Sequence, residues 1–98
     1  MGLTFLDREG TYNYTSSSVR FAALDGDRPV IYAVTRAALA KAEGVPVLVP
    51  VDCLRAAPSH CAAIRAIAGR KFAAGLINPD GIVMVEAGDL DPPERDGR

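Results

Sequence analysis

The fold is organised by residues 58–76, PSHCAAIRAIAGRKFAAGL, a stretch with no strong internal helix breaker. Its apolar side chains recur at steps of three and four residues, which predicts one apolar stripe along a helix. The stripe consists of Cys61, Ile64, Ile67, Ala68 and Phe72. Ser59 offers a hydroxyl N-cap, and Gly75 suits the left-handed conformation in which many helices end. We therefore predict that this helix covers one face of a sheet.

Two short runs of β-forming residues precede this helix and predict a hairpin. Residues 18–24 place Val19, Phe21 and Ala23 on one face, the alternation that is typical of a half-buried strand. Residues 30–34 are again β-branched and aromatic. The sequence DGDRP between the two runs is typical of a turn, so the runs are expected to pair.

The region between the hairpin and the long helix predicts a short helix and an extended connection. Thr35 offers a hydroxyl N-cap to residues 36–43, which are good helix formers and end at a glycine. Two prolines remove donors from residues 45–50, so we expect an extended connection lying against the core. Asp52 is expected to cap a further turn. Pro58 either kinks one long helix or separates two, and we prefer the kink.

These elements give the order β-β-β-α-α-β, with further strands expected at residues 3–6 and 82–86 and a loop at residues 7–17. The predicted fold class is α+β: a small antiparallel sheet with a short helix and a long, Pro58-kinked helix packed on one face. One core is expected to be shared by Val19, Phe21, Val30 or Ile31, Leu39, Ile64, Ala68 and Phe72. Residues 1–88 are expected to form this single domain, and the polar residues 89–98 a disordered acidic tail.

Composition restricts the class of protein. The chain has 98 residues and a net charge of −1, so no overall field favours nucleic acid or a membrane surface. Its apolar runs are far shorter than the roughly 20 residues that span a bilayer, and no signal peptide is recognisable at the start. Two cysteines make no disulfide framework. We therefore expect a cytoplasmic protein.

Several short segments resemble one bacterial family. They are residues 3–7, 19–21 with Asp25 and Gly26, residues 34–39, His60 with Ile64, Gly75, and Asp89 with Leu90. On these segments the chain resembles the YrdB-like bacterial family of unknown function (domain of unknown function 1488 family). It departs from the family at Cys61, where an arginine is usual, and at Pro58. The resemblance implies a compact α+β fold, and it implies no activity, cofactor or functional residue.

The residues with metal or nucleophile chemistry lie near the start of the long helix. They are Asp52, Cys53, His60 and Cys61. His60 and Cys61 are neighbours and so point about 100° apart on a helix, which suits neither one metal ion nor a Cys–His pair. Cys61 also falls on the apolar stripe. We therefore expect no catalytic residue, no cofactor and no metal.

Charge is distributed unevenly along the chain. Between residues 53 and 79 there are four basic residues and no acid, whereas five acids follow from Glu86 onward. The basic residues are Arg55, Arg65, Arg70 and Lys71. They could contact nucleic-acid phosphates, but Arg65 and Arg70 point about 140° apart and no aromatic residue is interleaved for base stacking.

Two classes of function follow from these observations. The preferred one is a non-enzymatic protein-interaction or self-associating module. Its contacts would use an edge strand or the small-residue side of the long helix, Ala62, Ala66 and Ala73. The alternative is a nucleic-acid-associated protein that uses the four basic residues. The sequence names neither the pathway nor the partner.

Overall fold

The computed structural model describes residues 3–6 and 9–90. Its centre is the predicted hairpin, formed by β3 (Ser18–Asp25) and β4 (Arg28–Thr35). The two strands pair antiparallel from Ser18 opposite Thr35 to Asp25 opposite Arg28, so only two residues form the loop. Gly26 is the first of these, and its φ of 67° suits the first central position of a tight hairpin turn. The hairpin is confirmed, with a shorter turn than expected.

The other strands make the sheet mixed. β1 (Thr4–Phe5) and β2 (Thr11–Asn13) both pair antiparallel with β3, at different ends of it. β5 (Ile82–Val85) pairs parallel with β4. The expectation of a wholly antiparallel sheet is therefore wrong at this edge. The chain crosses through helices between β4 and β5, and such a crossover brings the next strand back in the same direction.

The predicted loop at residues 7–17 also differs from the structure, since it contains β2. Tyr12 lies opposite Val19 in the register, so this short strand buries part of an aromatic ring against the core. Turn-forming residues around this strand make it difficult to recognise in the sequence. Pairing with the long β3 stabilises it, because a strand of this length does not persist alone.

The short helix α1 (Arg36–Glu43) forms where it was predicted. Thr35 Oγ1 accepts a hydrogen bond from the Ala38 N–H at 3.0 Å, which satisfies one of the free donors at the helix start. Gly44 ends the helix with a φ of 74°. Both predicted caps of this helix are confirmed.

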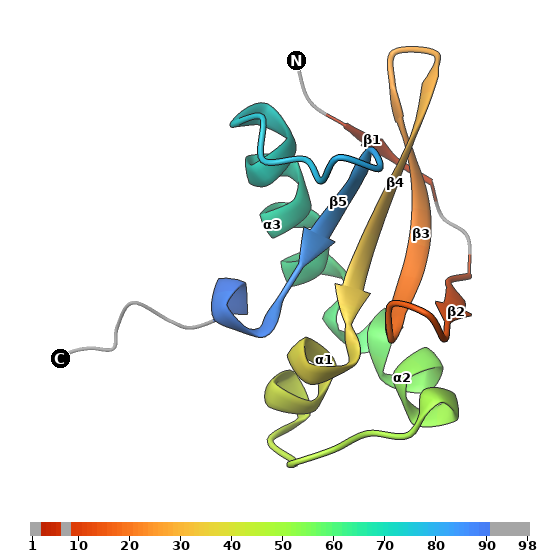
Figure 1. Cartoon of the computed structure of the whole chain (residues 1–98), viewed down its shortest axis with the longest axis vertical. Helices are drawn as coiled ribbons and strands as arrows, with labels where there is room; N and C mark the ends of the chain where they lie inside the picture. Colours follow the sequence, from red (N-terminus) through yellow and green to blue (C-terminus); the bar gives the residue numbers. More distant parts are fainter. Residues whose placement is uncertain (1–2, 7–8, 91–98) are drawn as a thin grey trace, which may run out of the picture.

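The second helical region runs without a gap through three segments. They are α2 (Pro50–Ala56), the 3₁₀ turn η1 (Ala57–His60) and α3 (Cys61–Ala73). Pro58 lies in η1, so the expected kink takes the form of a 3₁₀ turn between two α-helical parts (Figure 1).

The predicted N-caps of this region are wrong, whereas its predicted end is confirmed. Asp52 lies inside the first turn of α2, because the helix already begins at Pro50, whose missing N–H costs nothing there. Ser59 lies within η1, and no side chain caps α3. Gly75 has a φ of 76°, and the Leu76 N–H donates to the Lys71 carbonyl at 2.8 Å, the pattern of a glycine-ended helix.

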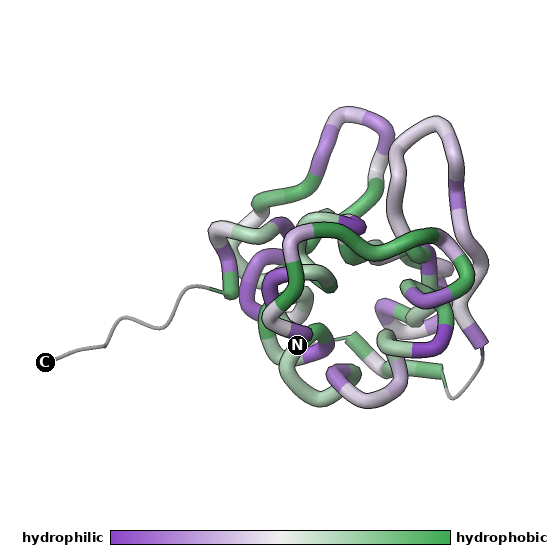
Figure 2. Tube along the Cα trace, turned by 90° about the horizontal axis from the view of Figure 1, so that it is seen from below, coloured by the Kyte–Doolittle hydropathy of each residue, from purple (hydrophilic) through white to green (hydrophobic). Residues whose placement is uncertain are grey.

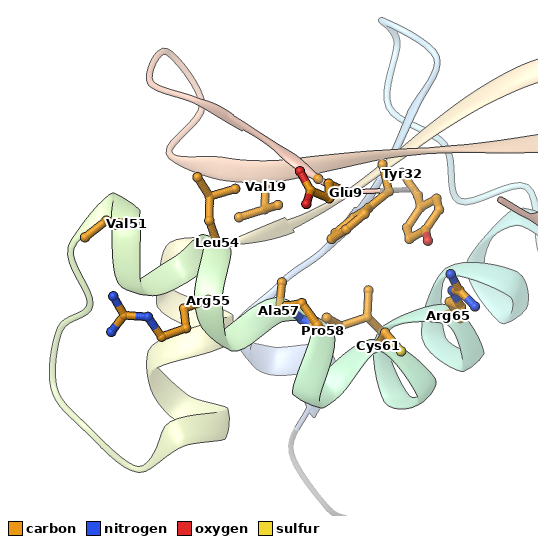
Figure 3. Close-up of a pocket in the computed structure, with 13 residues that line it drawn as sticks. Glu9, Val19, Tyr32, Val51, Leu54, Arg55, Ala57, Pro58, Cys61 and Arg65 are labelled. Atoms are coloured by element: carbon orange, nitrogen blue, oxygen red, sulfur yellow. The ribbon is translucent and has the colours of Figure 1, made fainter. Parts of the chain in front are cut away.

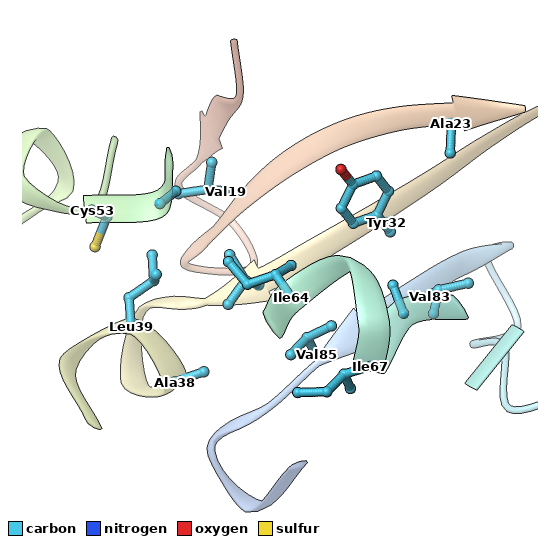
Figure 4. Close-up of a cluster of buried hydrophobic side chains, with 13 residues drawn as sticks. Val19, Ala23, Tyr32, Ala38, Leu39, Cys53, Ile64, Ile67, Val83 and Val85 are labelled. Atoms are coloured by element: carbon cyan, nitrogen blue, oxygen red, sulfur yellow. The ribbon is translucent and has the colours of Figure 1, made fainter. Parts of the chain in front are cut away.

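The helices cover one face of the sheet, and the core lies between them (Figures 1 and 4). The fully buried side chains include Val19, Tyr32, Val34, Leu39, Cys53, Ile64, Ala68, Val83 and Val85. Phe21, Val30 and Phe72 are half-buried and pack against this cluster. Ile31 is 37% exposed on the other sheet face, so Val30 is the core residue of the two alternatives. The predicted α+β class is confirmed.

The chain beyond β5 continues into the 3₁₀ turn η2 (Ala87–Leu90), which contacts α1. Asp89 and Leu90, which were assigned to the acidic tail, therefore belong to the folded part. The rest of that predicted tail, residues 91–98, lies outside the described residues. Among the helices that the structure describes, none is long and apolar enough to cross a membrane.

Candidate functional site

A pocket of about 430 Å³ lies between the sheet and the region where α2 passes into α3 (Figure 3). One wall comes from the sheet and the preceding segment, and the other from α2, η1 and α3. The lining residues are Glu9, Gly10, Val19, Phe21, Tyr32, Val51, Leu54, Arg55, Ala57, Pro58, Cys61, Ile64 and Arg65. The lining is mainly apolar with a few polar groups, and the volume is in the range of small-molecule sites.

The 3₁₀ turn η1 contributes to the pocket lining. Pro58 has no N–H to continue an α-helical ladder, so the chain changes path between α2 and α3. Ala57 and Pro58 then form the floor between the two helices, while Leu54 and Cys61 line the pocket on either side of the turn (Figure 3). A straight helix would hold these side chains on one line.

A glycine fixes the mouth of the pocket on the sheet side. A Cβ on Gly10 would overlap Val19 Cγ1 and would lie 2.7 Å from Phe21 Cε1, so the backbone here packs directly on β3. No larger residue allows this approach without a shift of the core. Glu9, the preceding residue, is exposed and lines the pocket beside it.

Tyr32 lies at the inner end of the pocket. Its ring stacks on Phe21 with centroids 5.2 Å apart and meets the edge of Phe5 at 5.3 Å. The residue is only 1% exposed, yet it lines the pocket, and its hydroxyl points toward α3 (Figure 3).

Arg65 lies on the α3 wall and has a structural partner. Its Nη2 donates to the Leu6 carbonyl at 3.2 Å, and its guanidinium carbon lies 5.6 Å from the centroid of the Phe5 ring. The side chain is half-buried. These contacts hold a cation in a fixed position at the pocket wall.

The two cysteines and His60 do not form one site. Cys53 is fully buried, and burial raises the pKa of its thiol despite the opposing charge of Arg36. Cys61 is half-buried and lines the pocket. His60 pairs with Glu43, at the end of α1. Across residues 3–6 and 9–90, no three His, Cys, Asp or Glu side chains are arranged to hold a metal ion.

The four basic residues of the alternative hypothesis are also separated. Arg55 pairs with Asp52 of the same helix at 3.2 Å, and Arg70 is exposed. Lys71 Nζ donates to the Met84 carbonyl at 2.7 Å and to Asp89 Oδ2 at 2.9 Å. Arg65 and Lys71 therefore bond to backbone carbonyls of distant segments, and the four residues do not form one exposed basic surface.

Asp89 and Lys71 together bind the outer edge of β5, and this pair is here called the β5 clamp. Asp89 Oδ2 also accepts a hydrogen bond from the Glu86 N–H at 2.8 Å. Partial burial raises the pKa of Asp89, but the hydrogen bonds from Glu86 and Lys71 outweigh it and leave the pKa below its usual value. At the other end of β5, Asp80 accepts from the Ile82 N–H at 3.1 Å. This edge is therefore occupied by side chains, the usual protection against pairing with another strand.

An exposed aliphatic surface borders the pocket. It consists of Val45, Val47, Val49, Val51 and Leu54, here called the valine surface, which are 39–62% exposed. The connection between α1 and α2 is hydrophobic along most of its length (Figure 2). The expectation that this connection lies against the core is wrong except at Leu48, which packs on the core cluster.

The valine surface has a simple geometric origin. An extended backbone sends alternate side chains in opposite directions, so burying Leu48 exposes its neighbours Val47 and Val49. Ala62, Ala66 and Ala73 are exposed on α3, as predicted, but they offer much less apolar area. Sequence reasoning missed the valine surface and the pocket. The signal is a run of three aliphatic residues between two prolines, Val47, Leu48 and Val49, which from the sequence is expected to lie against the core.

Comparisons with known proteins agree with this fold. The family model described as "Protein of unknown function (DUF1488)" matches residues 3–85. Among solved structures, the chain is similar to the crystal structure of a protein of unknown function from the DUF1488 family of Shewanella loihica PV-4. The TM-score is 0.76 at 13% identity, over 85% of this chain and 90% of that chain, which shows a shared fold. A comparison with curated proteins gave no match.

Proposed function

This chain belongs to the DUF1488 family of proteins of unknown function, and since the family supplies a fold without an activity, we propose that it is a non-enzymatic module that acts through protein contacts. The observation that carries the proposal is the valine surface. Aliphatic side chains that are exposed together on one short segment are typical of interaction sites, because their burial in water is favourable.

A second copy of the chain is the partner that this surface fits best. Asp52 and Arg55 lie on α2 among the aliphatic residues, and both are substantially exposed. Asp52 and Arg55 pair with each other at 3.2 Å, and across a two-fold axis two such pairs can lie side by side, so that each Arg55 also comes near the partner's Asp52. By contrast, the outer edge of β5 is occupied, which disfavours self-association through that strand.

Nucleic-acid binding has less support. Arg65 and Lys71 are engaged within the fold, and Arg55 has an acidic neighbour at 3.2 Å. Phosphate binding would require these cations to leave protein partners or to act at longer range. No second function is therefore proposed.

Sedimentation equilibrium tests the proposal. The wild-type protein is expected to dimerise, and the double variant Val47→Asp/Val49→Asp should weaken the dimer at least about tenfold, because it places charges in a desolvated contact. The control is Ala62→Asp/Ala66→Asp on the exposed side of α3, which should leave the dimer intact. Both variants change exposed residues, so their melting temperatures should match the wild type.

A charge exchange sharpens the test. Arg55→Asp alone should weaken the dimer by placing like charges across the axis, and adding Asp52→Arg should restore it. A wild-type protein that stays monomeric at about 0.5 mM, or equal weakening by the control variant, would contradict the proposal.

A further inference from the structure

We propose that the pocket between the sheet and α2–α3 receives the side chain of Val47 from a second copy of this chain. This inference rests on the proposed self-association through the valine surface, and it names the contact that each copy makes. The pocket continues the valine surface, because Val51 and Leu54 belong to both. Val47 belongs to the valine surface but does not line the pocket of its own chain.

The valine surface is small for an interface. A standard protein interface has roughly 20–30 residues on each side, whereas the valine surface has five. The adjoining pocket adds apolar area through its walls, which include Phe21, Ala57 and Ile64. A contact between two copies that covered the pocket together with the valine surface would therefore bury more apolar area than the valine surface alone.

The lining of the pocket suits an aliphatic side chain. Both of its arginines are engaged within the chain, Arg55 with Asp52 and Arg65 with the Leu6 carbonyl. Neither arginine therefore needs a charged occupant as its partner. Glu9 also lines the pocket, but this residue is exposed, so water can solvate its carboxylate. The mainly apolar lining favours an apolar group, whose transfer out of water is favourable.

A two-fold axis beside α2 brings Val47 of one copy to the pocket of the other. When each Arg55 lies near the partner's Asp52, the two α2 helices run antiparallel side by side. The connection before Pro50 of one copy then lies beside the end of the other copy's α2, where Ala57 forms the pocket floor (Figure 3). Because α2 has seven residues and is only about 10 Å long, this short connection can reach the pocket.

Val47 is the side chain of the connection that is best placed to enter. It is the most exposed residue of the valine surface, at 62%. In an extended segment Val45 and Val49 point to the same side as Val47, at steps of about 7 Å, so they can cover the mouth on either side of it. The pocket volume of about 430 Å³ leaves room for a branched side chain.

A disulfide cross-link tests the contact directly, because Cys61 lines the pocket. The full chain carrying Val47→Cys is treated with diamide, which takes up the two hydrogens released per disulfide, at a concentration at which the wild type dimerises. We expect a covalent dimer on a non-reducing gel, with the bond between positions 47 and 61 of different chains by peptide mapping. Adding Cys61→Ser should abolish it. The control is Ala66→Cys, at an exposed position of α3, which should remain monomeric on the gel.

Filling the pocket tests the contact without any change in the valine surface. Cys61→Phe, at a half-buried position, should weaken the dimer at least about tenfold in sedimentation equilibrium, whereas Cys61→Ala should leave it within about twofold. Val47→Ala should weaken the dimer at least about fivefold in the wild-type background. In the Cys61→Phe background it should have little further effect, because the contact is already lost.

The outcomes separate this inference from the proposed function. A dimer that Val47→Asp/Val49→Asp disrupts, but that Cys61→Phe leaves unchanged or that gives no bond between positions 47 and 61, would overturn the inference and leave the proposed function standing. Equal cross-linking of the Ala66→Cys control would overturn it as well. A wild-type protein that stays monomeric would overturn both.

Discussion

Ile64 is the residue on which the packing of α3 against the sheet depends most directly. It is 1% exposed and lies in the core cluster with Leu39 and Val85 (Figure 4). Replacing it by alanine removes three carbons, which corresponds to about 2.4 kcal/mol at roughly 0.8 kcal/mol per methylene, before any cavity term. Ile64 also borders the pocket, so the new space joins an existing one. We expect a loss of about 3 kcal/mol, inside the usual range for such changes.

Urea denaturation followed by circular dichroism measures this loss. Phe72→Ala on the same helix is the comparison, because Phe72 is half-buried and should lose less than about 2 kcal/mol. The slope of the free energy against urea should be unchanged in both variants. A loss below about 1 kcal/mol for Ile64→Ala, or a larger loss for Phe72→Ala, would refute the assignment of the buried face of α3.

Two further predictions concern the pocket mouth and the β5 clamp. Gly10→Ala should destabilise the fold by about 1–3 kcal/mol, because its Cβ meets β3 side chains, whereas Gly88→Ala, with no atom within 4 Å of the new Cβ, should have little effect in the same melts. Asp89→Asn should cost about 1–2 kcal/mol near neutral pH by weakening the contacts with Lys71 and Glu86. The fold lowers the pKa of Asp89. The contribution of its carboxylate to stability is therefore fully present above the ordinary pKa of 3.8, and it is lost as the pH falls through the lower pKa of the folded protein. The stability difference between Asp89→Asn and wild type should therefore shrink in acid, and a difference that persists at about pH 2 would count against the clamp.

Much of the scaffold was predictable from local sequence. The alternation in residues 18–24 sets which side chains of β3 face the core, and this depends only on the two-residue period of a strand. The Thr35 cap and the glycine end of α3 are equally local, since a hydroxyl or a missing Cβ acts on the adjacent backbone. The stripe of α3 also identified Ile64 and Ala68 as core residues from spacing alone.

The candidate sites were not predictable in the same way. The pocket joins Glu9, Tyr32 and Cys61, which come from three distant segments, so no spacing in the sequence brings them together. Tyr32 reads as an ordinary strand aromatic until the sheet places its hydroxyl in a cavity. The basic residues Arg65 and Lys71 read as surface charges, but each finds a backbone carbonyl more than ten positions away.

Local sequence was enough to predict the conformation and the facing of the main elements, namely the hairpin, α1 and the apolar stripe of α3. The contacts between distant segments became known from the fold alone. In it β5 runs parallel to β4, Thr11–Asn13 forms a strand, and residues 45–49 bury Leu48 and expose the valines around it. This difference arises because a backbone preference acts over a few residues and depends on the neighbouring side chains. Strand pairing, burial and pocket shape arise from contacts between distant segments, whose free energy no single segment carries.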